Sequence, residues 1–375
     1  MLAAGRRVLL GVILSLLALG GVLGPPSLPQ DRPLPEPPPP ALPAELRILR
    51  LQGRAYERGL AHGQALRSEI RQRLEKRLAR FAQEEPYGDL RSLIPTARRT
   101  LPPEVWDEVR GIAEGAGISL ESALLLNLWS PDGGDASGRG ALLAFPQNAS
   151  DAVALALHTR DGESREWLLQ VHQASNGLAY AVLGPPGEVG GWVGLNQAGL
   201  AAAGAPAPAL DRRPWGLPVP ALVGLLLRQA ATTDRASSIV AQASRGGGGA
   251  IVLTEGRRDH VACIEFTARR HTLGAPADRT LWWAGQFRDP WLRELAPAVA
   301  GAEEGREWLE ANRGWLSWEK AQGWLARQVW QGADFGALLD PASAELWVAT
   351  NGEGGPAGFV QISLEPYLAG GHEGR

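Results

Sequence analysis

The sequence predicts an α+β protein in which helices and antiparallel strands surround one large core. Two observations predict this fold class. Helical periodicity dominates residues 54–127, whereas short apolar runs separated by turn signals dominate residues 127–200. Helical and strand-like stretches then follow one another through the rest of the chain. With 375 residues, of which 45% are hydrophobic, the chain is long enough and apolar enough to bury such a core.

Composition and charge exclude several classes of protein. The net charge of −3 gives no electrostatic footprint for nucleic acid. The single cysteine, Cys263, excludes an internal disulfide framework. His172 and His260 are too sparse for a metal site, and no spacing of Cys, His, Asp and Glu matches a known metal pattern. We therefore expect no metal and no cofactor.

The first 44 residues predict a targeting segment and a spacer. Arg6 and Arg7 precede an apolar run from Val8 to Leu23, so residues 1–24 are typical of a signal peptide or of an N-terminal membrane anchor. Residues 25–44 are rich in proline and predict an extended linker. We expect export to the periplasm, the cell surface or the medium, with membrane contact confined to residues 8–23.

Residues 45–127 predict one strand followed by helices. The strand ends at Gly53, and an amphipathic helix follows, since apolar residues recur every fourth position from Leu66 to Leu78. A further helix presents Val105, Val109, Ile112 and Ala113 on one side. Gly117 is expected to end that helix and Ser119 to cap the next one.

Residues 127–200 predict adjacent antiparallel strands. The apolar runs are separated by the turn signals Asp132-Gly133-Gly134, Asp161-Gly162, Gly184-Pro185-Pro186-Gly187 and Gly190-Gly191. Arg160, Asp161 and Asn196 interrupt these runs at expected strand ends, where functional sites are often built.

The chain after residue 200 predicts two helices and two hairpins. The first helix is very apolar from Ala221 to Leu227 but too short to span a bilayer. One hairpin turns around Glu255-Gly256, and the closing hairpin pairs Glu345–Thr350 with Gly358–Ser363.

These motifs resemble those of the isopenicillin-N (acyl-coenzyme A:6-aminopenicillanate) acyltransferase family. Its members are autoproteolytic N-terminal-nucleophile hydrolases related to the choloylglycine hydrolases. The matching residues are Leu126-Asn127, the glycine-rich run from Gly53 to Gly63, and the stretch GPPGEVGGWVGLNQAGLA. The resemblance implies a four-layer αββα sandwich, in which residues 45–140 correspond to the propeptide region and residues 141–369 to the core. It also implies that His62, which invites a catalytic interpretation, lies on a helix that only packs on the core.

The resemblance also implies where a nucleophile should stand. Members of the family cut themselves between a glycine and a cysteine, and the matching residues here are Gly140 and Ala141. Ala141 has neither thiol nor hydroxyl, so it can perform neither self-cleavage nor attack on a substrate. In the family, residues at the places of Arg160, Asp161 and Asn196 orient the nucleophile's amine and stabilise the oxyanion. The alternative to these catalytic roles is structural: Arg160 and Asp161 would form an ion pair at a strand end, and Asn196 would stabilise a turn.

Further positions of the implied site are also changed. The family has Asn or Ser where this chain has Gly249, and Thr-Asn-His where it has Ala284, Gly285 and Gln286. The residues expected to border a bound ligand are Gly140, Gly249, Gly285 and Gln286. Other nucleophiles are poorly supported: Ser130 and Ser137 are expected in a solvated loop, and Cys263 as a buried, inert thiol.

Three hypotheses about function follow. The chain is a degenerate family member that binds an acyl or amide ligand, or a peptide or protein partner, without autoproteolysis. Alternatively, it is an active amidohydrolase or acyltransferase with an unidentified nucleophile, or a structural envelope protein with a filled pocket. An open polar cleft from Ala141 to Asn196 would favour the first two, whereas a cleft plugged by Trp282 or Trp283 would favour the third.

Overall fold

The structure is a computed structural model that describes most of the chain between residues 46 and 369. The described ranges are 46–84, 90–129, 139–146, 151–158, 167–213, 215–256, 258–295, 302–312, 314–352, 355–356 and 358–369. The predicted targeting segment (1–24) and linker (25–44) lie outside them. Contacts group the described residues into one compact unit. Within these ranges no helix has the length and apolar character needed to cross a membrane.

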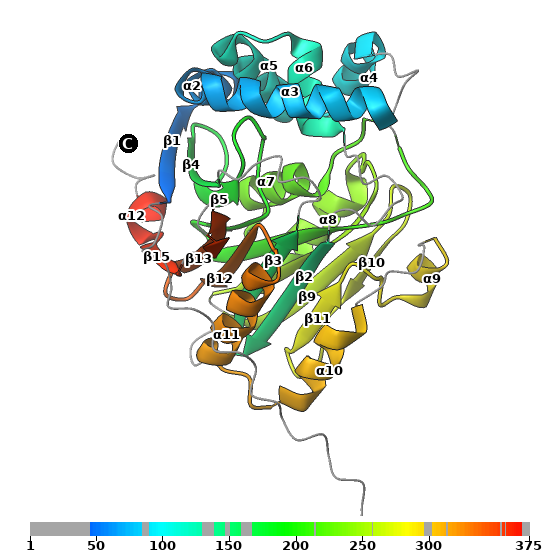
Figure 1. Cartoon of the computed structure of the whole chain (residues 1–375), viewed down its shortest axis with the longest axis vertical. Coiled ribbons are helices and arrows are strands. Elements are labelled where there is room, and N and C mark those ends of the chain that lie inside the picture. The colour runs from blue at the N-terminus through cyan, green and yellow to red at the C-terminus, as the bar shows by residue number, and fades with distance from the viewer. Residues whose placement is uncertain are drawn as a thin grey trace, which may run out of the picture. The chain divides into compact units, whose positions relative to one another are not determined.

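The described chain forms four layers, helices–sheet–sheet–helices (Figure 1). Three apolar clusters fill the spaces between these layers. The first lies between the N-terminal helices and the eight-stranded sheet, the second between the two sheets, and the third between the seven-stranded sheet and the last long helices. This arrangement confirms the predicted four-layer αββα fold class.

The eight-stranded sheet has the order β1-β4-β5-β6-β7-β8-β9-β10. All neighbours are antiparallel except β1 and β4, which are parallel. The strands are β1 (Arg47–Gly53), β4 (Leu168–Ala174), β5 (Tyr180–Gly184), β6 (Val193–Asn196), β7 (Leu200–Ala207), β8 (Gly248–Glu255), β9 (Arg258–Phe266) and β10 (His271–Gly274). Since β1 belongs to this sheet, the segment 45–140 contributes to the strand layers as well as to the helices.

The seven-stranded sheet has the order β11-β2-β3-β12-β13-β14, and β15 also pairs with β13. Its strands are β2 (Arg139–Pro146), β3 (Asp151–His158), β11 (Leu281–Ala284), β12 (Phe335–Asp340), β13 (Glu345–Gly352), β14 (Gly355–Pro356) and β15 (Val360–Ser363). The antiparallel pairing of β13 with β15 confirms the predicted closing hairpin.

The N-terminal helices cover one face of the eight-stranded sheet (Figure 1). They are α2 (Ala55–Ala65), α3 (Arg67–Glu84), η1 (Leu90–Ser92), α4 (Leu93–Thr100), α5 (Pro103–Ala116) and α6 (Leu120–Leu128). The single helix predicted after Gly53 is wrong in one respect: it is two helices, because α2 ends at its cap Leu66 and α3 begins at Arg67. Gly117 ends α5 in the left-handed conformation (φ 65°), and the Ser119 hydroxyl caps α6, as predicted.

Helices α2 and α5 approach so closely that four glycines form their contact. A Cβ on Gly59, Gly63, Gly111 or Gly115 would lie 2.0, 2.5, 2.2 or 2.3 Å from a backbone oxygen of the other helix. Side chains are therefore excluded from this interface, and the two backbones pack directly on one another.

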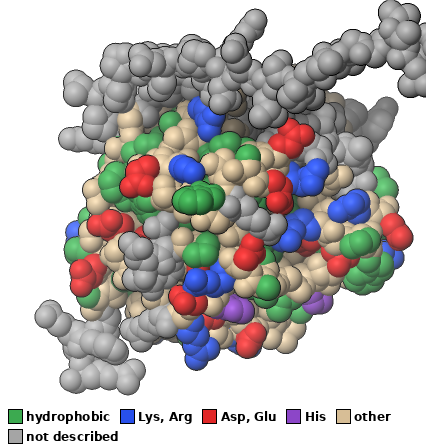
Figure 2. Space-filling model, turned by 90° about the horizontal axis from the view of Figure 1, so that it is seen from below, with side chains coloured by type: hydrophobic (Ala, Val, Ile, Leu, Met, Phe, Trp, Pro, Cys, Tyr) green, Lys and Arg blue, Asp and Glu red, His purple; other side chains and the backbone are tan. Residues whose placement is uncertain are grey.

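The remaining helices are α7 (Val219–Gln229), α8 (Thr233–Gln242), α9 (Pro290–Arg293), α10 (Ala302–Asn312), α11 (Trp318–Trp330) and α12 (Glu365–Leu368). Helices α10 and α11, which were not predicted from the sequence, form the fourth layer through tryptophan contacts. The ring of Trp324 on α11 packs edge-on against Trp282 at 5.2 Å and stacks with Trp308 on α10 at 6.0 Å. On the face seen from below, charged side chains of both signs are interspersed with hydrophobic ones (Figure 2).

Candidate binding site

Position 141 lies on the helix-facing side of β2. Side chains alternate along this strand: Leu142 and Ala144 point between the sheets, whereas Leu143 and Phe145 point toward α10 and α11. Ala141 packs with the second set and is half-buried. Its methyl group therefore borders the tryptophan-rich outer layer, and the space between the sheets nearby is occupied by the buried Trp283.

The structure brings some of the predicted ligand-binding positions together and separates another. Ala284 pairs with Ala141 across β11 and β2, so Gly285 and Gln286 follow directly from a neighbour of the predicted nucleophile position. Gly285 is buried in a left-handed turn (φ 65°). Gly249 lies in the other sheet, where a Cβ would stand 2.6 Å from Val219 Cγ2, so no polar side chain fits there without movement of α7.

Asn196 is committed to the backbone. Its Nδ2 donates to the carbonyl oxygens of Leu227 (2.8 Å) and Ala230 (2.7 Å), and its Oδ1 accepts from the N–H groups of Ala198 and Leu200, both at 3.0 Å. These four bonds use the donors and acceptors of the amide. The arrangement is that of a buried turn asparagine, with no group left to hold a ligand. Arg160, Asp161, Ser130 and Ser137 lie outside the described residues.

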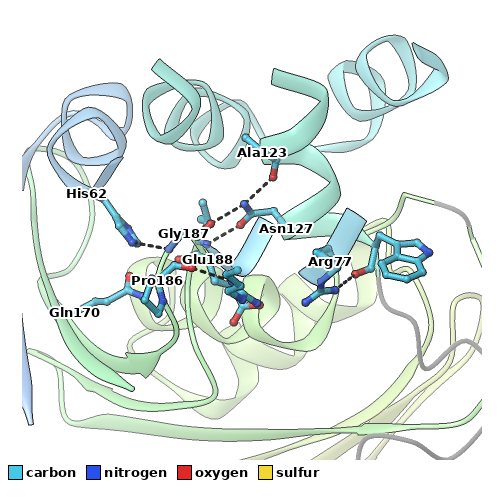
Figure 3. A network of polar contacts seen from close by, with 11 residues as sticks. His62, Arg77, Ala123, Asn127, Gln170, Pro186, Gly187 and Glu188 are labelled. Atoms are coloured by element: carbon cyan, nitrogen blue, oxygen red, sulfur yellow. Dashed lines mark hydrogen bonds and ion pairs between the residues drawn. The ribbon is translucent and has the colours of Figure 1, made fainter. Parts of the chain in front are cut away.

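A second asparagine, predicted from the sequence only as a helix end, holds the Gly-Pro-Pro-Gly loop (Figure 3). Asn127 Nδ2 donates to Gly187 O (2.9 Å), and Val189 N donates to Asn127 Oδ1 (2.7 Å). His62 Nε2 accepts from Gly187 N at 2.9 Å, and Arg73 Nη1 donates to Pro186 O at 2.9 Å. Three helices therefore clamp one loop of the eight-stranded sheet.

His62 acts in this clamp as a neutral acceptor. The side chain is fully buried, and burial lowers the pKa of His62 to about 4. A neutral ring is required, because the ring nitrogen must present a lone pair to the Gly187 N–H. This packing role agrees with the one implied by the family resemblance.

Beside the clamp lies a buried charged cluster that no sequence pattern indicates. Arg58 Nη2 pairs with Glu108 Oε2 at 2.9 Å, and the other oxygen of Glu108 lies 3.5 Å from His172 Nδ1. Burial raises the pKa of Glu108, against the effect of Arg58, and lowers the pKa of His172 well below its usual value. Since all three side chains are inaccessible, the cluster joins α2, α5 and β4 rather than contacting a ligand.

A pocket of about 230 Å³ lies where α3, the end of α6 and the loop after β7 meet. Five aromatic residues contribute to its walls: Phe81, Trp129, Trp192, Trp215 and Phe266. Phe81 packs edge-on against Trp129 at a centroid distance of 5.3 Å and lies 6.4 Å from Trp215. These ring contacts hold the aromatic walls of the pocket against one another.

Two backbone features also shape the pocket. Trp215 has a positive φ of 63°, which is unfavourable for a bulky residue and typical of functional sites. Gly246, Gly247 and Gly248 also line the pocket, with backbone alone. A Cβ on Gly247 would meet no atom within 4 Å, so the open space of the pocket adjoins this residue.

The described side chains of the pocket offer apolar and cationic contacts. The described lining consists of aliphatic, aromatic, glycine and proline residues together with Arg212 and Arg213. It contains no thiol, hydroxyl, imidazole, carboxylate or amine, so it supplies neither a nucleophile nor a general base. The arginines and the indole N–H groups can hold an anionic or carbonyl-bearing group, and the rings can hold an apolar one.

Other candidate reactive groups are unsuitable. Cys263 is buried in the layer between the sheets, and burial raises the pKa of its thiol. Among the described residues, no group of three or more His, Cys, Asp and Glu side chains is arranged to hold a metal ion.

Comparisons with known proteins find no matching family model and no matching curated protein. Similar solved structures include a mutant of conjugated bile acid hydrolase from Clostridium perfringens, which is 8% identical, with 60% of this chain and 93% of that chain covered and a TM-score of 0.40. A Caenorhabditis elegans N-acylethanolamine-hydrolyzing acid amidase orthologue is 12% identical, with 54% and 93% covered and a TM-score of 0.42. These similarities are too weak to inform on activity, and the fold class rests on the layers and strand order of this chain.

Proposed function

We propose that this chain binds a small ligand carrying an acyl or amide group and cuts neither the ligand nor itself. One observation carries the proposal: the described lining of the aromatic pocket holds no nucleophile and no general base. The described side chains of this pocket can retain an apolar ligand, and none of them can attack an amide bond.

Position 141 supports the same proposal independently. Self-cleavage at Gly140–Ala141 would need a thiol or hydroxyl on residue 141, and alanine offers only a methyl group. That methyl packs against the outer tryptophan layer. The scaffold is therefore of linear-amide hydrolase and acyltransferase type without the group that starts its chemistry.

The pocket's dimensions indicate the kind of ligand. Its volume of about 230 Å³ is below the ~300–1,000 Å³ of most drug-sized ligand sites, so a short acyl chain suits it better than a large ring system. The acyl chain would lie between Trp129 and Trp215, with the polar end toward the Arg213 side chain.

The proposal is tested by titrating the full protein with N-octanoylglycine and following tryptophan fluorescence. We expect saturable binding and full recovery of the uncut probe. Gly247→Leu should weaken binding at least tenfold, because the new side chain enters the pocket. The matched control is Gly323→Leu on α11, which also adds a side chain at a position with no atom within 4 Å. Release of octanoate and glycine, or binding unaffected by Gly247→Leu, would contradict the proposal.

A structural envelope protein is the second candidate, and Trp283 favours it. Trp283 is only 1% exposed, and Leu142 is its partner across β11 and β2. This side chain fills the space between the sheets beside the expected active site. The two candidates differ in the titration: a structural protein gives no saturation with any acyl probe.

We also propose that the domain is exported, on the strength of the apolar run from Val8 to Leu23. A reporter that is active only outside the cytoplasm, fused to the C-terminus, should be active. A silent reporter on a fusion protein that accumulates in the cytoplasm would contradict export.

A further inference from the structure

Three segments of the chain meet beside α9: residues 210–213, 267–271 and 286–295. Leu210 N donates to Leu295 O at 2.7 Å, and Arg269 N donates to Asp211 Oδ2 at 3.1 Å. Arg270 Nη1 donates to Trp291 O at 3.2 Å, which joins the start of β10 to α9 (Figure 1). Together these segments form a continuous surface, here called the arginine face.

The arginine face carries a local excess of positive charge on a chain with net charge −3. Its six arginines are Arg212, Arg213, Arg269, Arg270, Arg288 and Arg293, whereas its carboxylates are Asp211, Asp289 and Glu294.

Two of these carboxylates are bound inside the surface. Asp211 accepts from Thr267 Oγ1 (2.8 Å), and Asp289 accepts from the N–H groups of Trp291 and Leu292. The exposed side chain of Arg269 makes no hydrogen bond or ion pair with any residue that the structure describes, and the exposed Arg288 side chain has only the attraction of the Glu265 carboxylate. Positive charge is therefore left facing the solvent.

Exposed apolar side chains lie among these arginines. Of the five large hydrophobic side chains that are exposed among the described residues, Leu210 (68%) and Trp291 (49%) belong to this face, and Leu273 (50%) follows it on β10. The guanidinium carbon of Arg270 stands 4.5 Å from the centre of the Trp291 ring, which holds the ring beside a cation. Tryptophan beside arginine at a surface is typical of contact with the lipid–water interface.

We propose that the arginine face docks on a bilayer surface that contains anionic headgroups. The guanidinium groups would bind headgroup phosphates, while Leu210, Leu273 and Trp291 enter the interfacial region. The exposed apolar side chains favour a bilayer over an anionic polymer such as RNA, because a bilayer interface buries them and a phosphate chain does not. This contact is additional to the one expected from residues 8–23, and it does not depend on the proposed ligand.

The experiment must report on the arginine face alone, since the N-terminal apolar run would hold the whole chain at a vesicle. Cys263, the only cysteine, is buried, so an introduced thiol can be labelled selectively. In the reporter variant Leu210→Cys, an environment-sensitive dye is attached to the new thiol on the arginine face. Ile48→Cys receives the same dye at a site that is 38% exposed on β1, the opposite edge strand of the sheet.

With vesicles of phosphatidylcholine and phosphatidylglycerol (7:3), we expect a blue shift of the dye at position 210 and none at position 48. Pure phosphatidylcholine should give no shift. Combining Arg269→Gln with Arg288→Gln should reduce the blue shift at saturating anionic vesicles by about half or more, since each cation near an anionic surface contributes to docking of this face. The matched control combines Arg98→Gln with Arg99→Gln, two exposed arginines on α4, and should leave the shift unchanged.

Three results would overturn the proposal: no shift at position 210, equal shifts at positions 210 and 48, or an equal shift with neutral vesicles. A response to heparin at the same midpoint as to anionic vesicles would assign the face to anionic polymers and also overturn it. Thermal unfolding of each variant checks that the arginine changes leave the fold intact. If the double variant does not fold, the single variant Arg269→Gln is used in its place.

Discussion

Residue 141 carries a methyl group on the helix-facing side of β2, beside the outer tryptophan layer. The family resemblance implies supporting groups around a nucleophile there, and this chain is expected to lack them. The side-chain amide of Asn196 makes four hydrogen bonds to the backbone. Gly285 and Gln286 occupy the positions where the resemblance implies Asn and His. Restoring a thiol alone therefore restores little of the chemistry.

We expect Ala141→Cys to stay uncut, or to cut only over days. Each missing oxyanion donor costs roughly 10²–10³ in rate where one has been removed, and at least two positions are changed here. Adding Gly285→Asn and Gln286→His should speed cleavage, and the left-handed conformation of Gly285 is one that Asn tolerates. The smaller fragment is followed on a gel, with Ala156→Cys on the paired strand as control. Rapid, complete cleavage of the single variant would show that the site is otherwise intact.

Individual site residues were predictable from the sequence only where their partners are close in the chain. Ser119 and Gly117 were predicted correctly because caps and left-handed ends are local. The bonds of Asn127 to Gly187 and Val189 depend on two segments about sixty residues apart, and no periodicity reports such contacts. For the same reason the commitment of Asn196 to the end of α7 could not be foreseen.

At the scale of elements, the clamp on the Gly-Pro-Pro-Gly loop predicts acid sensitivity. Burial lowers the pKa of His62 from 6.5 to about 4, so between these values the unfolded chain binds the proton and the folded chain does not. The contribution of the neutral His62 ring to the free energy of unfolding is therefore fully present above pH 6.5. It decreases by about 3 kcal/mol as the pH falls from 6.5 to 4. His172, whose pKa burial also lowers, acts in the same direction.

Replacing His62 by Gln tests this assignment. The Gln side chain keeps an acceptor within reach of the Gly187 N–H but does not titrate, so denaturant unfolding should show a smaller loss of stability between pH 6.5 and 4. His260→Gln, at a half-exposed position on β9, is the control and should retain the loss. An unchanged pH profile in His62→Gln would refute the role given to this ring.

The glycine contact between α2 and α5 predicts opposite effects for one substitution at two helical positions. Gly59→Ala should destabilise the protein by about 3 kcal/mol or more, because the new Cβ would stand 2.0 Å from Glu108 O. Gly323→Ala, exposed on α11 with no atom within 4 Å of the new Cβ, should stabilise by about 0.5–1 kcal/mol. Both are measured by chemical denaturation, and equal effects would contradict the close packing.

For the whole molecule, the sequence predicted the fold class and the strand meander but not how the layers are filled. Turn signals between apolar runs predicted that the consecutive strands β4, β5, β6 and β7 are antiparallel neighbours. The parallel pairing of β1 with β4 joins strands more than a hundred residues apart, which local patterns do not encode. The aromatic pocket was missed because its walls come from helices, strands and loops between Phe81 and Phe266 that meet only in the folded chain.

The mass of the intact, purified protein tests the central claim most directly. Because residue 141 lacks a nucleophile, we predict one polypeptide that runs unbroken through Gly140–Ala141, shortened only by removal of an N-terminal signal. Two fragments that meet at this bond would show that the chain cuts itself, and a scaffold that binds without cutting would then be excluded.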